Sequence, residues 1–288
     1  MKWFDYAAPA TAADALDTLA KNPGALMLAG GTDLLVQLRT GRRETALVVD
    51  IKKIPELNAL TANSGGLTLG AAVPCYVIER NSDVRRHWHA LAEVAGLIGG
   101  TQIQGRASIG GNLCNAAPSA DAVPLLIAMG AICEIASAAG RRTIPVEQFC
   151  TAPGRNVLAP GEILVALHIP KPPPGSGACY LRFIPRNEMD IAVAGAGVAV
   201  TIANGRISAA RVALSSVAPT PLFVDAAGAA IVGQAPEAAA VAKAAQAARD
   251  AARPISDMRG TEEYRRHLCA VLTRRALETA IARAKESN

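Results

Sequence analysis

Two pairs of adjacent glycines, roughly 80 residues apart, constrain the fold of this chain more than any other feature. Gly30-Gly31 follows a short apolar segment, residues 25–29, and Gly110-Gly111 lies in a turn-rich stretch, residues 99–115. Glycine has no Cβ and allows unusual φ angles, so the backbone near such a pair can approach a ligand closely. Successive amides in such a turn form a concave nest that suits a pyrophosphate. The two pairs therefore indicate an anionic cofactor.

Each pair alone is typical of an ordinary turn. Neither G-x-G-x-x-G nor G-x-x-x-x-G-K-[ST] occurs, so the sequence does not support a Rossmann or P-loop site. Gly195 and Gly197 lie inside a predicted strand without a third glycine, and we interpret them as a packing feature. A helix predicted from Leu34 onward would add its positive dipole end to the first loop.

The pattern of apolar residues predicts an N-terminal half that mixes helices and strands. A helix should open at Thr11, because Asp14 favours its N-terminus. Further helices are predicted at residues 84–97 and 124–128. Strands are predicted at residues 25–29, 46–51, 66–73, 131–137 and 162–170.

A proline- and glycine-rich linker, residues 171–177, divides the chain. After it, residues 192–203 and 206–217 flank Asn204-Gly205 and should form a β-hairpin, since Asn-Gly supplies the positive φ angles of a tight turn. Helices are predicted at residues 225–232, 236–253 and 261–285. We therefore predict an α+β chain with an N-terminal domain at 1–172, in two subdomains of about 1–55 and 56–172. A C-terminal domain of antiparallel sheet and helical bundle should span 176–288.

Composition excludes several classes of function. Aromatic residues make up 3% of the chain, too few for stacking on bases, and the net charge of +5 comes from scattered arginine pairs. We expect no nucleic-acid partner. Six dispersed cysteines without a C-x-x-C spacing predict reduced thiols in a cytoplasmic protein, with no metal or iron–sulfur ligation by this chain. The N-terminus is too polar for a signal peptide, and we expect no membrane span.

Five segments together resemble one family. They are residues 29–33 (AGGTD), 107–124 (ASIGGNLCNAAPSADAVP), 160–164 (PGEIL), 182–192 (RFIPRNEMDIA) and 257–265, which begins DMRG. The chain resembles the FAD-binding medium subunits of molybdenum hydroxylases, such as xanthine dehydrogenase and carbon monoxide dehydrogenase. The resemblance implies an FAD domain of the vanillyl-alcohol oxidase (PCMH) type and a C-terminal domain similar to that of the carbon monoxide dehydrogenase flavoprotein.

The resemblance also implies which residues bind FAD. Residues 27–34 would wrap the pyrophosphate, and residues 108–112 would complete that cradle. Asp121 would accept a hydrogen bond from a ribose or ribityl hydroxyl, and Ile98 and Leu164 would contact the rings, although Leu164 alone also fits an ordinary core position. The expected site comprises Met27, Leu28, Ala29, Gly30, Gly31, Thr32, Asp33, Leu34, Ile98, Ser108, Ile109, Gly110, Gly111, Asn112, Asn115, Asp121, Leu164, Arg182 and Ile191.

Two positions depart from the family pattern. Arg182 stands where the family often has lysine, which keeps a charge near the flavin but changes its geometry. Ile191 stands where the carbon monoxide dehydrogenase relatives have tyrosine, which leaves an apolar, small face beside the ring. No histidine lies in either glycine loop, so we expect non-covalent FAD. We interpret the four histidines as structural or exposed.

The function implied by the resemblance is electron transfer. Substrate would be oxidised at a molybdopterin cofactor on a large subunit, and electrons would pass through two two-iron two-sulfur clusters on a small subunit. FAD on this chain would collect them for NAD or another acceptor, within a dimer of heterotrimers. The chain itself needs no catalytic residue, and none is indicated. The alternatives are a self-sufficient FAD-dependent oxidase or reductase, disfavoured by the small, aromatic-poor C-terminal half, and a non-catalytic scaffold, disfavoured by the intact loops.

Overall fold

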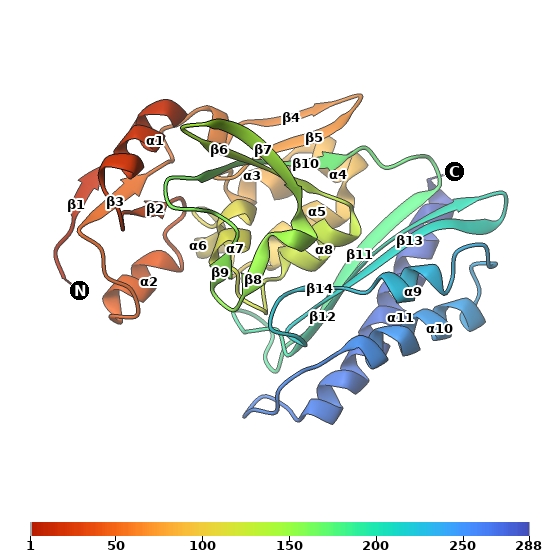
Figure 1. Cartoon of the computed structure of the whole chain (residues 1–288). Coiled ribbons are helices and arrows are strands. Elements are labelled where there is room, and N and C mark those ends of the chain that lie inside the picture. The colour runs from red at the N-terminus through yellow and green to blue at the C-terminus, as the bar shows by residue number, and fades with distance from the viewer. Residues whose placement is uncertain (1, 288) are drawn as a thin grey trace.

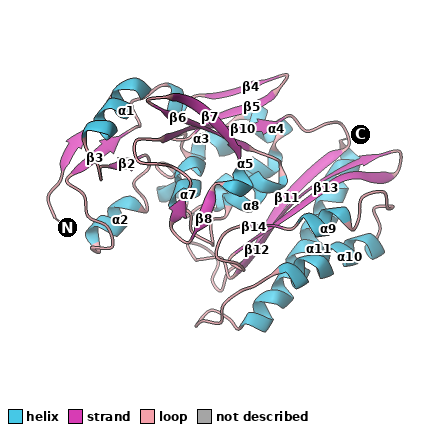
Figure 2. Cartoon of the chain, viewed as in Figure 1, coloured by secondary structure: helices cyan, strands magenta, loops and turns pink. Residues whose placement is uncertain are grey.

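A computed structural model describes residues 2–287, so the outermost residues of the two predicted domains, 1 and 288, lie outside the described residues. Helices and strands alternate only in residues 5–50, and beyond them they follow one another in separate runs of helices and of strands (Figure 2), which confirms the α+β class. Three parts follow one another along the chain (Figure 1): a small N-terminal subdomain, a central subdomain, and a C-terminal sheet covered by two long helices.

The first subdomain is built on a parallel sheet with the order β1-β3-β2. Its strands are β1 (Asp5–Ala7), β2 (Leu26–Leu28) and β3 (Leu47–Asp50), and its helices are α1 (Ala12–Lys21) and α2 (Leu34–Arg39). The predicted helix start is confirmed, because the Asp14 amide donates to the Thr11 hydroxyl at 3.1 Å. β2 ends directly before the first glycine pair, which places that loop at the carboxyl edge of the sheet.

The second subdomain contains an antiparallel sheet with the order β4-β5-β10-β6-β7. The strands are β4 (Leu60–Asn63), β5 (Gly66–Gly70), β6 (Ile132–Ser137), β7 (Gly140–Pro145) and β10 (Ile163–Pro170), with a small ribbon of β8 (Cys150–Ala152) and β9 (Arg155–Asn156). The helices are α3 (Cys75–Arg80), α4 (Ser82–His87), α5 (His89–Leu97), α6 (Thr101–Gln104), α7 (Ile109–Asn115) and α8 (Ala122–Ala128), and the 3-10 turns are η1 (Glu56–Asn58) and η2 (Val146–Gln148).

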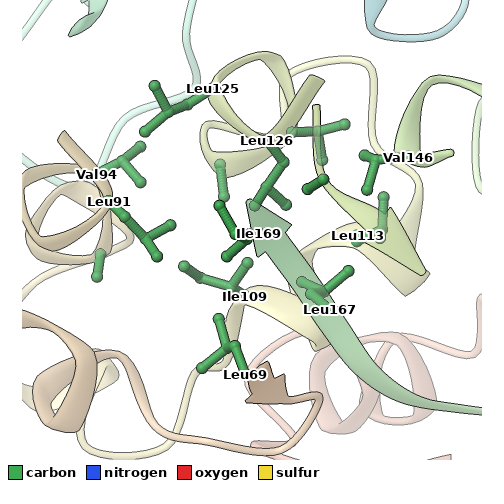
Figure 3. Close-up of a cluster of buried hydrophobic side chains, with 14 of the residues drawn as sticks. Leu69, Leu91, Val94, Ile109, Leu113, Leu125, Leu126, Val146, Leu167 and Ile169 are labelled. Atoms are coloured by element: carbon green, nitrogen blue, oxygen red, sulfur yellow. The ribbon is translucent and has the colours of Figure 1, made fainter. Parts of the chain in front are cut away.

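The core of this subdomain lies between the sheet and its helices. Figure 3 shows Leu91 of α5, Ile109 of α7 and Leu126 of α8 gathered around Leu167 and Ile169 of β10. These five side chains are at most 1% exposed. Burying each one stabilises the fold by about 1.5 to 3 kcal/mol, so α7, which carries the second glycine pair, is firmly held.

Two predicted elements differ from the structure. Residues 99–115 are not only turns, because α6 and α7 lie within them; the Ser108 hydroxyl caps α7 by accepting from the Gly111 amide at 3.0 Å. The predicted helix 84–97 is two helices, α4 and α5, broken at Trp88. The Trp88 indole donates to the Pro170 carbonyl at 3.0 Å, and this tertiary contact overrides the helical pattern.

The C-terminal domain is an antiparallel sheet, β11-β12-β13-β14, with helices on one face. Its elements are β11 (Ser176–Phe183), β12 (Ala194–Ala203), β13 (Arg206–Ser215), β14 (Leu222–Phe223), α9 (Asp225–Ala229), α10 (Ala238–Ala251) and α11 (Glu262–Glu286). The predicted hairpin is confirmed, with φ of 52° at Asn204 and 73° at Gly205. β11 begins inside the predicted linker and was not expected. None of the helices within residues 2–287 is long and apolar enough to span a membrane.

The other face of this sheet packs on α8 of the central subdomain, and Gly197 allows the approach. A Cβ on Gly197 would lie 2.5 Å from the Pro124 carbonyl carbon. A Cβ on Gly195 would lie 2.5 Å from the Tyr180 hydroxyl. Both glycines are therefore packing features, as their position in a strand predicts.

Candidate cofactor-binding site

The two glycine loops lie side by side, although they are far apart in the sequence. A Cβ on Gly30 would lie only 2.1 Å from the carbonyl oxygen of Arg106. The Arg106 Nε in turn donates to the Gly30 carbonyl at 3.2 Å. The first loop, after β2, therefore rests directly on the segment that leads into α7, and the two loops form one concave surface.

Backbone amides at this surface are free to bind a ligand. Among the described residues, the amides of Gly30, Gly31, Thr32 and Asp33 donate no hydrogen bond. At the N-terminus of α7, the Gly111 and Asn112 amides donate to Ser108, and those of Ile109 and Gly110 donate no hydrogen bond within residues 2–287. Such a set of amides is suited to an anion with several oxygens, such as a pyrophosphate.

The four glycines serve different purposes. Gly30 and Gly110 permit close backbone contacts, since a Cβ on Gly110 would lie 2.4 Å from the Ala71 carbonyl oxygen. Gly31 adopts a φ of 77°, which other residues rarely accept. Gly111 has an ordinary φ, and its absent Cβ would meet only the Ser108 hydroxyl, at 3.0 Å. Since no backbone crowds Gly111, the space beside it is available to a ligand.

A cleft that is open to solvent joins the two loops to the start of β10. Most of the predicted site residues line it: Met27, Ala29, Gly30, Gly31, Thr32, Asp33, Leu34, Ile98, Ser108, Gly110, Gly111, Asn112, Asn115 and Leu164. Leu28 and Ile109 are buried behind its wall, at 7% and 1% exposure. Asp121, Arg182 and Ile191 do not line it. Their assignment as FAD ligands stays a prediction.

Asp121 and Arg182 form a buried ion pair between the two domains. The Arg182 Nη1 lies 2.5 Å from the Asp121 Oδ2, and the Tyr180 hydroxyl donates to the Asp121 Oδ1 at 2.8 Å. Burial raises the pKa of Asp121, while Arg182 and Tyr180 favour its charged form. Burial and the Asp121 carboxylate together raise the pKa of Tyr180 well above its usual value. Both oxygens of Asp121 are thus engaged by the C-terminal domain.

Ile191 lies in the loop between β11 and β12, where its side chain is 49% exposed. Met189 in the same loop is 45% exposed and contacts α6, with its sulfur 3.5 Å from the Gln102 Nε2. A Cβ on Gly100 would lie 3.3 Å from that sulfur. This loop therefore reaches the segment just after Ile98, which lines the cleft.

Several cleft residues were not anticipated: Gln37, Arg43, Ile51, Ala71, Ala107, Cys114 and Ile163. Ala107, Cys114 and Ile163 lie within the segments that carry the family resemblance, but the resemblance assigned them no role. The other four lie in no motif, because each contributes a single side chain from an element whose sequence gives only its helix or strand pattern. Their place follows from packing of the two subdomains. Burial raises the pKa of the Cys114 thiol to about 12, so it is protonated and unreactive at neutral pH.

The residues present fit an FAD molecule. The free amides suit its pyrophosphate, the gap beside Gly111 leaves room for it, and Ile98 and Leu164 offer apolar surface for a ring. No group of three or more His, Cys, Asp or Glu side chains within residues 2–287 is arranged to hold a metal ion. The fold and the cleft define a flavoprotein with a separate C-terminal domain.

The comparisons with known proteins identify the family. Residues 2–172 match the family described as "FAD binding domain in molybdopterin dehydrogenase", and residues 179–280 match "CO dehydrogenase flavoprotein C-terminal domain". The chain belongs to the FAD-binding medium subunits of the molybdenum hydroxylases, and it is the flavoprotein component of an oxidoreductase. The exact domain boundaries, at residues 172 and 176, stay a prediction.

Relatives match over the whole chain. The xanthine dehydrogenase FAD-binding subunit of Escherichia coli O157:H7 is 35% identical, covering 98% of both chains. The carbon monoxide dehydrogenase medium chain of Afipia carboxidovorans is 33% identical, again over 98% of both chains. Among solved structures, carbon monoxide dehydrogenase from Hydrogenophaga pseudoflava superposes with a TM-score of 0.94 at 32% identity, covering 98% of both chains.

Proposed function

We propose that this subunit transfers electrons, through FAD, from two-iron two-sulfur clusters of a small partner subunit to NAD or another acceptor. The observation that supports this most is the cleft itself, whose unbonded loop amides and apolar side chains fit FAD. The one thiol that lines it, Cys114, is held protonated. The relatives bear the names of subunits or medium chains.

FAD supplies the redox chemistry when it is bound, and this chain positions it. The amides of residues 30–33 and of the α7 N-terminus bind the pyrophosphate. Ile98 and Leu164 contact the rings and exclude water from that part of the cleft. We also propose that Arg182 places a positive charge near the flavin, that Asp121 accepts a hydrogen bond from a sugar hydroxyl, and that Ile191 lies beside the ring.

We propose further that the chain assembles with a large molybdopterin subunit and a small iron–sulfur subunit, paired into a dimer of heterotrimers in the cytoplasm. Its relatives from carbon monoxide dehydrogenases are named medium chains, which supports a complex of several subunits. All six cysteines are free thiols in this chain, which suits a reducing compartment.

Purification of the tagged chain from its native source tests this function. We expect two partner chains, with molybdenum and iron in the complex and NAD reduction or another acceptor activity that depends on all three chains. The chain alone should be yellow and turn over no organic substrate. A flavoprotein that purifies alone, free of molybdenum and iron, yet oxidises an organic substrate would show instead that it is a self-sufficient oxidase or reductase.

FAD should be bound without a covalent bond, because the cleft is lined by no histidine in the part of the chain that the structure describes. Acid precipitation should release all of the flavin into the supernatant in a 1:1 ratio to protein. Flavin that remained in the washed pellet would contradict a non-covalent site. Pellet and supernatant can be compared by absorbance after neutralisation.

A further inference from the structure

A hydrogen bond between two side chains joins the two subdomains across the cleft. The Gln37 Nε2 of α2 donates to the Asn115 Oδ1 of α7 at 2.9 Å, and both residues line the cleft. α2 belongs to the small N-terminal subdomain and α7 to the central one (Figure 1). The contact therefore holds α2, at one edge of the cleft, against α7 at the opposite edge.

The same glutamine positions Arg43. Its backbone oxygen accepts from the amide of Arg42 at 2.9 Å and from the amide of Arg43 at 3.3 Å. Gly41 allows this reversal with a φ of 71°. The turn after α2 thus folds back on Gln37, and Arg43 lines the cleft whereas its neighbour Arg42 does not.

Arg43 has no partner that would explain its place. Within residues 2–287 its guanidinium makes no ion pair, and among the described residues that line the cleft Arg43 is the only basic side chain and Asp33 the only acidic one. The pyrophosphate of FAD carries two negative charges, and the loop amides offer only partial positive charges. An arginine fork matches the geometry of phosphate oxygens.

We propose that Arg43 is the cationic partner of the FAD pyrophosphate. We also propose that the Gln37–Asn115 hydrogen bond is a clasp, which holds α2 at the edge of the cleft over the bound cofactor. The proposal rests on FAD occupying this cleft. It adds two residues that neither glycine loop contains. It also predicts that FAD affinity depends on ionic strength through one named side chain.

The charge of Arg43 is tested by titrating flavin-free full-length chain with FAD and following the flavin fluorescence. Arg43→Gln should bind FAD about tenfold more weakly at low salt, since one charge-assisted hydrogen bond is lost. The difference should shrink as salt approaches about 1 M, where exposed charges are screened. Arg43→Lys should recover part of the affinity.

Arg42→Gln is the matched control, because it removes the same charge one residue away from the cleft, and it should bind FAD like the wild type. Equal affinity of Arg43→Gln and the wild type, an equal loss in both variants, or a loss that salt does not change would each overturn the role of Arg43. A wild-type chain that fails to bind FAD would instead overturn the proposed function. Circular dichroism and thermal unfolding confirm that each variant is folded.

The clasp is tested by the rate at which bound FAD leaves. Gln37→Leu removes the hydrogen bond to Asn115, so FAD should dissociate about fivefold faster when the holoprotein is diluted into excess apo-flavoprotein acceptor. Val36→Ala, on the exposed face of the same helix, is the control and should leave the rate unchanged. An unchanged rate in Gln37→Leu, or an equal increase in Val36→Ala, would overturn the clasp.

Discussion

Replacing Gly110 by valine is expected to destabilise the whole FAD domain, whereas the same substitution at Gly111 should strongly weaken FAD binding and leave the fold intact. A Cβ on Gly110 would lie 2.4 Å from the Ala71 carbonyl oxygen, which cannot move without shifting the end of β5. Forcing a side chain into such a contact costs about 3 kcal/mol or more. Thermal unfolding of the flavin-free variant should therefore show a large loss of stability.

Gly111 offers the contrast, because its Cβ would meet only the Ser108 hydroxyl, a side chain that can rotate away. A valine there occupies space in the cleft beside the loop amides. Losing access to two charge-assisted hydrogen bonds should weaken FAD roughly a hundredfold. A Gly111→Val chain that retains stoichiometric FAD, or that is as unstable as Gly110→Val, would show that this part of the cleft does not hold the cofactor.

Gly110 and Gly111 show what the sequence predicts about the site and what it does not. The pairs Gly30-Gly31 and Gly110-Gly111 predict an anion cradle, and the structure does bring both pairs to one cleft. The sequence does not say which glycine of each pair faces the ligand and which faces the protein. That distinction depends on the approach of Ala71 and Arg106, which come from other segments of the chain.

The predicted elements agree best with the structure where residues close together in the sequence determine them. The Asn204-Gly205 turn fixes its hairpin, and the Thr11 cap fixes the start of α1. The predictions failed where tertiary contacts decide: Trp88 interrupts a helical pattern to reach Pro170, and Ser108 caps a helix in a segment that reads as turns. β11 was missed because its first residues continue a proline- and glycine-rich stretch.

The site residues divide in the same way. The contiguous loop residues line the cleft as their motif suggests, whereas Gln37 and Arg43 carry no motif and could not be selected among many polar residues. Gln37 matters only because α2 faces α7, and Arg43 only because the turn folds back on Gln37. The first fact comes from the packing of the two subdomains, and the second from the turn that follows α2.

The structure changes the expected effect of substituting Asp121 more than that of any other predicted site residue. Seen from the sequence alone, Asp121→Ala should weaken FAD by about 1–3 kcal/mol and spare the fold. In the structure that substitution leaves the guanidinium of Arg182 buried without its carboxylate and the Tyr180 hydroxyl without its acceptor. Breaking one side of a buried ion pair costs about 3 to 5 kcal/mol, so Asp121→Ala should lower the free energy of unfolding by that amount. Chemical denaturation of the flavin-free chain measures it.

A double variant separates this structural role from a role in binding FAD. Asp121→Leu combined with Arg182→Met removes both charges, and apolar replacement of a buried ion pair is often neutral or stabilising. The double variant should therefore recover part of the stability that Asp121→Ala loses, since the Tyr180 hydroxyl still lacks its acceptor. If it then binds FAD as weakly as Asp121→Ala does, the pair contacts the cofactor; if FAD affinity returns with stability, Asp121 serves only to join the domains. An Asp121→Ala chain as stable as the wild type would contradict the ion pair itself.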